Sequence, residues 1–339
     1  MGIHTSGCKL IKLGVIVNPM SGRDVRRVTA KASTSGHHEK QQLVTRLVLA
    51  ALEHGVDKVF LGNEPFRINE RAIENLEEKE KIQQLSYPLK HTAEDTLTLT
   101  NMMWAEGCRV FIVLGGDGTN RIVAKAQPDA IILPLSTGTN NVFPLRVEAS
   151  VAGAAAGLIA NRKINYKNHC RRCKQIKVTI NGEARDLALI DMVLLKGDHI
   201  GSVLPFSENN LSQLFLTRAE PASVGMSPIG GFILPCHEED DFGVMVDCSK
   251  PTRYRVRVPL SPGLYGDVNL SKVERLELGQ SYQQTYRSID PGILAFDGDR
   301  SISLEEGDNV EITIRRDGPW IIYPEKILHI AAQSGLLTR

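Results

Sequence analysis

The sequence is 339 residues long, which is enough for two globular domains of ordinary size. Hydrophobic residues make up 42% and charged residues 23% of the chain, a balance that excludes a disordered, fibrous or membrane-embedded protein. The formal net charge of +1 excludes a long-range field that would gather nucleic acid or an anionic bilayer. An anionic ligand must therefore be held by a local site.

The N-terminus lacks the apolar stretch and small-residue cleavage site of a secretory signal, and no run of about 18 apolar residues occurs. We therefore expect a cytoplasmic protein with reduced thiols. Cys170 and Cys173 form a Cys-x-x-Cys pair, but no second pair of ligands lies nearby at a spacing that suits zinc. This pair is interpreted as two thiols in a basic connector, and no metal site is expected.

The first half of the chain alternates apolar runs with amphipathic stretches. The predicted strands are Leu13–Val17, Lys58–Leu61, Arg109–Leu114 and Ala130–Leu135. The predicted helices are Glu39–Glu53, Asn69–Gln84, Ala93–Glu106, Arg121–Ala126 and Glu148–Ala160. This alternation is typical of a parallel sheet covered by helices on both faces.

The second half is rich in short strands separated by Gly, Asn and Pro turns. The predicted strands are Gln175–Ile180, Leu187–Leu195, Val244–Asp247, Arg253–Val258, Val273–Leu278 and Val310–Arg315. Asn181-Gly182 is a hairpin signal. We expect an α/β domain over residues 1–165, a β-sandwich domain over 166–325 and a tail over 326–339 that packs back on the first domain, with a cleft between the two domains.

The sharpest chemical signal is the turn Gly115–Thr119, which directly follows the predicted strand Arg109–Leu114. Its glycines let a polyanion approach backbone N–H groups, and the N-terminus of a following helix adds partial positive charge. A carboxylate beside a phosphate is repelled unless it accepts a proton or holds a cation, so Asp117 is the leading catalytic candidate. The alternative is a tight turn in which Asp117 only caps the next helix. Neither a Walker A motif nor a Gly-x-Gly-x-x-Gly after the first strand is present.

A strand that runs into Gly-Gly-Asp-Gly-Thr resembles the signature of the superfamily that unites NAD kinases, diacylglycerol kinases and sphingosine kinases. The segment Asn18–Gly22, which reads Asn-Pro-Met-Ser-Gly, is similar to the nucleotide-cleft motif of the lipid-kinase branch. The segment Thr137–Asn141 resembles the second glycine-threonine-asparagine motif of both branches. Considered locally, the first segment is also a common strand-ending turn and the second a loop before the next helix.

Three segments of the second half add to the resemblance. Ala188–Asp191 is similar to the Asn-Glu/Asp motif of NAD kinases, although Ile190 stands where the family has asparagine. Ser223–Gly231 looks like a variant of the family's Gly-Ser-Thr-Ala-Tyr…Gly-Gly segment without the tyrosine, and Phe296–Arg300 resembles the late Asp-Gly-Glu/Gln turn. Asp191 is alternatively a strand residue at the domain interface, and Asp297-Gly298 a hairpin dipeptide.

The combination is closest to the acetoin-catabolism protein X group of ATP-NAD kinase-like proteins. The resemblance implies a Rossmann-like domain, a β-sandwich domain, and ATP with Mg²⁺ in the cleft between them. It implies nucleotide or phosphate contacts from Asn18, Ser21, Gly22, Gly115, Gly116, Gly118, Thr119, Thr137, Gly138, Thr139, Asn140 and Asn141, and acceptor contacts from Asp191, Ser223 and Asp297.

The leading hypothesis is transfer of a phosphoryl group from ATP to the ribose 2′-hydroxyl of NAD, with Asp117 as the base. The alternatives are a lipid or long-chain alcohol as acceptor, or an accessory protein that binds nucleotide without turnover. Small nucleotides and further copies of the chain are the expected partners. Nucleic acid is not expected because the net charge is small, and a membrane is not expected because no basic amphipathic helix stands out.

Overall fold

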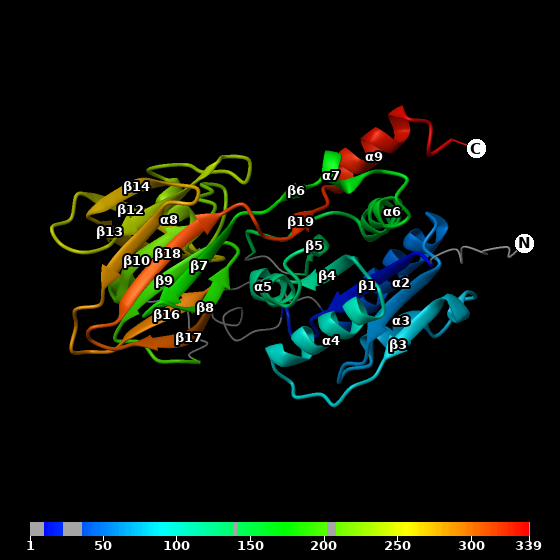
Figure 1. The fold of residues 1–339 in the computed structure, drawn as a ribbon, viewed down its shortest axis with the longest axis horizontal. Helices are drawn as coiled ribbons and strands as arrows, with labels where there is room; N and C mark the ends of the chain where they lie inside the picture. The colour runs from blue at the N-terminus through cyan, green and yellow to red at the C-terminus, as the bar shows by residue number, and fades with distance from the viewer. Residues whose placement is uncertain (1–9, 23–35, 138–140, 202–207, 339) are drawn as a thin grey trace, which may run out of the picture.

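The computed structural model describes residues 10–22, 36–137, 141–201 and 208–338 (Figure 1). One half of the molecule is a seven-stranded sheet with the order β3-β2-β1-β4-β5-β19-β6. Its strands are β1 (Lys12–Val17), β2 (Lys58–Gly62), β3 (Ile82–Leu85), β4 (Val110–Gly115), β5 (Ile131–Ser136), β6 (Arg171–Arg172) and β19 (Trp320–Ile321). All neighbours are parallel except β6, which runs antiparallel to β19.

Helices cover both faces of this sheet. They are α2 (His37–Glu53), α3 (Ile68–Ile73), α4 (Ala93–Ala105), α5 (Asp117–Ala126), α6 (Ala149–Ala160), α7 (Tyr166–His169) and α9 (Pro324–Gln333). Alternate residues of β4 face opposite sides: Ile112 packs in the core with α2, α6 and α9, whereas Phe111 and Val113 pack with α4 and α5. This two-residue period is what a strand buried on both faces requires.

The other half contains two antiparallel sheets and a separate hairpin. The six-stranded sheet has the order β14-β11-β10-β9-β16-β17, and the four-stranded sheet has the order β15-β18-β7-β8. The strands are β7 (Gln175–Ile180), β8 (Glu183–Ala188), β9 (Asp191–Lys196), β10 (Leu211–Leu216), β11 (Phe242–Asp247), β14 (Lys272–Glu277), β15 (Ser281–Thr285), β16 (Gly292–Phe296), β17 (Asp299–Leu304) and β18 (Asn309–Arg315). The hairpin consists of β12 (Tyr254–Ser261) and β13 (Leu264–Leu270), and one short helix, α8, covers Ser227–Gly231.

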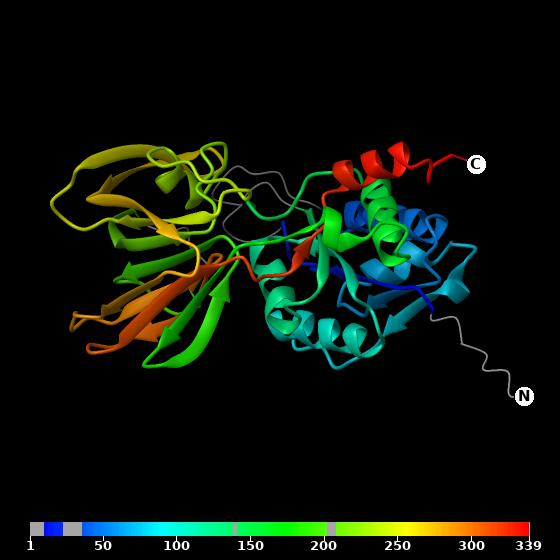
Figure 2. The same ribbon diagram turned by 45° about the horizontal axis from the view of Figure 1, so that its top comes forward.

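These sheets form layers. One apolar core lies between the four-stranded and six-stranded sheets, and a second lies between the six-stranded sheet, α8 and the inner face of the β12–β13 hairpin. The chain passes between the two halves of the molecule at β6 and again at β19, which lie side by side (Figure 2). The fold is therefore an α/β half with a parallel sheet and a β-rich antiparallel half, as the sequence predicted.

Most predicted elements are present, and the exceptions have physical causes. The helix predicted over Asn69–Gln84 is wrong: α3 ends at Ile73, and residues 82–85 instead form β3, an edge strand paired with β2. Partner strands outweighed local helical spacing there. The hairpin predicted at Asn181-Gly182 is confirmed, because both residues have positive φ and join β7 to antiparallel β8.

The single strand predicted over Leu187–Leu195 is also wrong, because it is divided between β8 and β9. The backbone N–H groups of Leu189 and Ile190 donate to the carboxylate of Asp297, each at 2.8 Å. The chain leaves one sheet at this point and enters the other. The α9 helix contributes Ile327 and Ala331 to the core of the α/β half. The domain boundaries at residues 165 and 325 stay predictions.

None of the helices in the described part of the chain is long and apolar enough to cross a membrane.

Candidate functional site

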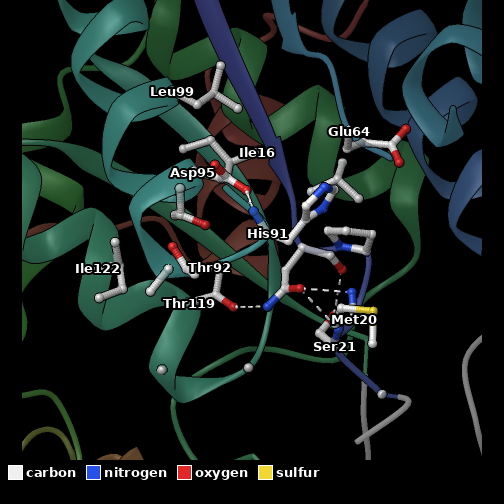
Figure 3. A pocket seen from close by; sticks show the side chains of 18 of the residues that line it. Ile16, Met20, Ser21, Glu64, His91, Thr92, Asp95, Leu99, Thr119 and Ile122 are labelled. Atoms are coloured by element: carbon white, nitrogen blue, oxygen red, sulfur yellow. Dashed lines mark hydrogen bonds between the residues drawn. The ribbon is translucent and has the colours of Figure 1, made fainter. Parts of the chain in front are cut away.

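A cavity of about 710 Å³ lies at the carboxyl end of the parallel sheet. The end of β1, the loop after β2, the segment before α4 and the first turn of α5 line it from the α/β half, and residues of the β-rich half close the other side. Figure 3 shows Ile16 and Leu99 on one side of this cavity with Asp95 beside them, and Ser21 and Thr119 on the other side. The carboxyl end of a parallel sheet is where α/β folds usually bind ligands.

The glycine turn is the beginning of α5, four residues earlier than the helix predicted from Arg121. Because α5 starts at Asp117, the N–H groups of its first turn have no partner within the helix and can bind an anion. A Cβ atom on Gly115 would lie 2.5 Å from the side chain of Thr119, and one on Gly116 would lie 2.8 Å from Asn141. These two glycines therefore let the turn pack closely against its neighbours.

Asp117 is the first residue of α5, and it faces the cavity. Its carboxylate accepts hydrogen bonds from the backbone N–H groups of Phe143, at 3.0 Å, and Val142, at 3.2 Å. Burial of the carboxyl group and the nearby charge of Asp297 raise the pKa of Asp117 to about 7, although the two N–H groups and Arg218 act in the opposite direction. A carboxyl group with this pKa can accept a proton near neutral pH.

Asp297 approaches the same cavity from the β-rich half, on the turn between β16 and β17. Its backbone is left-handed, with φ of 48°, a conformation that aspartate tolerates better than most residues. The carboxylate accepts N–H bonds from Leu189, Ile190 and Asp191 at 2.8 to 3.1 Å. Burial raises its pKa, whereas the nearby guanidinium of Arg121 and the three N–H groups lower it.

Arg121 joins the two halves of the molecule beneath the cavity. It extends from α5 and is 4% exposed, and its guanidinium binds Asp186 of β8 at 3.0 Å and Asp299 of β17 at 2.7 Å. Lys125, one turn further along α5, reaches the other oxygen of Asp186 at 3.1 Å. This ion-pair network fixes α5, and with it Asp117, against the β-rich half.

The loop after β1 forms the polar end of the cavity. Asn18 donates its amide N–H to the hydroxyl of Thr119 at 2.8 Å, a contact drawn in Figure 3, and its amide oxygen accepts from the N–H groups of Met20 and Ser21. The hydroxyls of Ser21 and Thr137 are 2.5 Å apart. The three motifs identified in the first half of the sequence are thus in direct contact.

Sequence reasoning missed Lys40, which supports this loop. It is fully buried on α2, and its ammonium group donates to the backbone carbonyls of Asn18, Pro19 and Ser21 at 2.6 to 2.9 Å. Lys40 and Arg121 both lie near the N-terminus of a helix, where the helix dipole disfavours a cation. A cation at this unfavourable position was the feature of the sequence that could have indicated a tertiary partner for each residue.

A second missed residue is Arg218, at the end of β10 in the β-rich half. It is buried, pairs with Glu238 at 2.7 Å, and lies over the ring of Phe143 at 5.2 Å. Its Nη1 atom also donates to the carbonyl of Val142 at 3.4 Å. Arg218 therefore holds the segment whose N–H groups bind Asp117.

The remaining predicted site residues are distributed as follows. Asn18, Ser21, Gly22, Gly116, Gly118, Thr119 and Asn141 line the cavity together with Asp117 and Asp297. Gly115 and Thr137 adjoin lining residues, whereas Gly138, Thr139 and Asn140 lie outside the described residues.

The other two predicted acceptor residues lie away from the cavity wall. Asp191 is buried, and its carbonyl accepts the N–H of Asp297 at 2.9 Å. The hydroxyl of Ser223 donates to the carbonyl of Glu220 at 2.7 Å. Neither is among the described residues that line the cavity, so their roles in binding an acceptor stay predictions.

Comparison with known proteins agrees with this architecture. Residues 13–164 match the ATP-NAD kinase N-terminal domain, and residues 174–317 match the acetoin catabolism protein X C-terminal domain. A putative diacylglycerol kinase from Bacillus anthracis str. Sterne has a similar fold, with a TM-score of 0.50 at 14% identity over 93% of this chain and 98% of that chain.

A curated relative extends over most of the sequence. Acetoin catabolism protein X of Cupriavidus necator is 30% identical over 315 residues, which cover 89% of this chain and 87% of the relative. The chain therefore belongs to the acetoin catabolism protein X family, with an N-terminal domain of the ATP-NAD kinase type.

Proposed function

We propose that this protein transfers a phosphoryl group from ATP to an alcohol, and that the acceptor is the ribose 2′-hydroxyl of NAD. The observation that carries the proposal is Asp117, a half-buried carboxyl group at the N-terminus of α5 with a pKa of about 7, facing a cavity of about 710 Å³. A general base works best when its pKa lies near the operating pH. The N–H groups beside it offer a place for the transferring phosphate.

The cavity has two unlike ends that suit the two parts of a nucleotide. The first turn of α5 and the loop at Asn18–Gly22 would hold phosphates, while Ile16, Tyr87 and Leu99 offer apolar surface for a base. No cluster of three or more metal-ligand side chains occurs within the described ranges. Mg²⁺ would therefore arrive with ATP and gain at most one or two protein carboxylates, as Mg²⁺–nucleotide sites commonly do.

In this mechanism Asp117 accepts the proton of the attacking hydroxyl while the γ-phosphoryl group moves from ATP to the hydroxyl oxygen. Val142 and Phe143 hold the carboxylate in position through their N–H groups. Asp191, Ser223 and Asp297 are the proposed acceptor contacts. NAD is favoured as acceptor by the match of residues 13–164 to the ATP-NAD kinase domain.

A lipid alcohol is the second candidate acceptor. Met20 and Phe66 both line the cavity and are 55% and 38% exposed, so its mouth has apolar side chains open to the surface. Ile190, at the position where NAD kinases have asparagine, is fully buried in the core and offers no amide to a dinucleotide. The third candidate is a nucleotide-binding accessory protein without turnover.

The decisive experiment measures NADP formed from ATP, Mg²⁺ and NAD by the wild-type protein and by Asp117→Asn. We expect the variant to lose transfer by about 10²- to 10⁴-fold, the usual contribution of a general base, while ATP affinity changes little. The control variant is Asp290→Asn. Asp290 is exposed and far from Asp117 in the sequence, so this variant should retain full activity.

Two results would redirect the proposal. Wild-type protein that binds ATP but forms no NADP would exclude NAD, and the same assay with diacylglycerol or a long-chain alcohol would then test the lipid acceptor. Equal activity of wild type and Asp117→Asn would remove Asp117 from the role of base.

A further inference from the structure

The outward face of the β12–β13 hairpin is an unusually basic surface in an otherwise nearly neutral protein. Arg255 and Arg257 alternate along β12, Arg253 immediately precedes the strand, and all three are exposed, while Val256 and Val258 point inward to the core. Residues two apart in a strand lie on the same face, so the three guanidinium groups form one row. The net charge of the whole chain is only +1, so this row is a local concentration of positive charge.

The partner strand leaves most of this charge uncompensated. In the antiparallel register Arg257 lies opposite Asp267 and Arg255 opposite Asn269. Asp267 contacts both arginines, at 3.3 Å and 3.5 Å, and is the acidic residue that the hairpin itself supplies. Arg255 and Arg257 remain 70% exposed at their side chains, where such contacts contribute little.

The same face continues into an apolar tip. Tyr265 lies opposite Pro259 in the register, two positions along from Arg257, and Leu264 precedes it as the first residue of β13. Tyr265 is 58% exposed and Leu264 is 42% exposed. A row of cations that ends in an exposed aromatic and an exposed aliphatic side chain is the combination found on surfaces that bind the membrane interface.

The tip of the hairpin is also at the mouth of the cavity. Ser261, the last residue of β12, and Pro262, in the turn that follows, line the cavity together with Met20 and Phe66. Met20 and Phe66 are exposed at this cavity, and the exposed side chains of Leu264 and Tyr265 follow Pro262 closely along the chain.

We propose that the outer face of the β12–β13 hairpin docks on an anionic membrane surface, with the arginine row at the headgroups and the tip residues at the acyl boundary. This orientation would place the cavity mouth against the bilayer. The sequence predicted no membrane partner because it has no basic amphipathic helix, but here a hairpin presents the charge. A nucleic acid would engage the arginines but would gain little from the aliphatic side chains at the entrance.

The test is co-sedimentation of the full-length protein with sucrose-loaded vesicles, without nucleotide, so that the result does not depend on phosphoryl transfer. We expect binding to vesicles of phosphatidylcholine with phosphatidylglycerol, weak binding to phosphatidylcholine alone, and loss of binding as salt is raised. Arg255→Gln/Arg257→Gln should weaken the binding by roughly 25-fold, since each arginine near an anionic surface contributes about fivefold. Leu264→Ser/Tyr265→Ser should weaken it by a smaller factor.

The matched control is Arg185→Gln/Arg315→Gln, which removes two exposed arginines from the four-stranded sheet. Its binding should equal that of the wild type, and the circular dichroism spectrum of each variant confirms folding. The proposal is overturned if wild type does not bind anionic vesicles, if the control loses as much binding as the hairpin variant, or if only a short RNA duplex binds the hairpin.

Discussion

The two carboxylates at the cavity come from different halves of the molecule and are supported in different ways. Asp117 belongs to the α/β half, and its loop is held by Arg218 of the β-rich half through a carbonyl and a ring contact. Asp297 belongs to the β-rich half, and Arg121 of α5 lies close enough to lower its pKa directly. Each carboxylate is thus supported by an arginine from the opposite half of the molecule. Of these two arginines, Arg121 forms ion pairs with residues of the other half, and Arg218 does not.

Burial raises the pKa of both carboxyl groups, so the choice of Asp117 as the base rests on its position in the first turn of α5. Asp117 has two backbone donors and a cation that acts from behind a loop, whereas Asp297 has three donors and a nearby guanidinium. Desolvation and a neighbouring negative charge then raise the pKa of Asp117 to about 7.

The largest effect is expected from Arg121→Met. This change leaves the buried carboxylate of Asp186 with Lys125 as its remaining cation, and removal of one member of a buried ion pair typically costs about 3–5 kcal/mol. The free energy of unfolding, measured by urea denaturation, should fall by about that amount. Arg67→Met, which removes an exposed pair with Glu70, is the control and should change it by less than about 1 kcal/mol. Similar losses in both variants would show that Arg121 does not join the halves.

The pH dependence comes next. Because the base must be deprotonated, kcat/KM should rise about tenfold per pH unit below 7 and level off above it. Asp297→Asn should move the midpoint to lower pH, because the charge of Asp297 raises the pKa of Asp117. A midpoint near 4 in the wild type would contradict the assignment of Asp117 as the titrating base.

The same pKa shift has a consequence for stability. The fold favours protonated Asp117, so the stabilisation is complete below the unfolded-state pKa near 4 and is lost as pH rises through about 7. The free energy of unfolding of Asp117→Asn should therefore fall less than that of the wild type between pH 4 and pH 7.

The smallest effect is expected from Arg218→Lys, which keeps the charge but loses the planar contact with Phe143 and the bond to Val142. A loosened segment holds Asp117 less well, so kcat should fall by about tenfold while the KM for ATP stays unchanged. Steady-state kinetics with varied ATP would check both values. An increase in the KM alone would mean that Arg218 supports the nucleotide rather than the base.

Much of the fold could be predicted because it depends on local patterns. The apolar runs of β1, β4 and β5 and the helical spacing of α2 and α4 are properties of consecutive residues. Strands such as β16 and β17 were missed, and β3 was taken for a helix, because their partners are distant or lie at a sheet edge.

The residues of the candidate site likewise fall into those that a local sequence pattern predicts and those that it does not. Asp117 could be identified from the strand and glycines that precede it, because a turn of this kind depends on residues adjacent in the sequence. Lys40, Arg121 and Arg218 could not be assigned, because the groups that they bind lie 19 to 178 residues away along the chain.

By itself, the sequence determined where the glycine turn would form and which carboxylate it would carry. Only the tertiary structure decided that Asp117 would be desolvated, that Asp297 would lie near it, and that an arginine from each half would support the other. The physical reason is that desolvation and Coulomb interactions depend on distances in space, whereas turns and strand patterns depend on order along the chain.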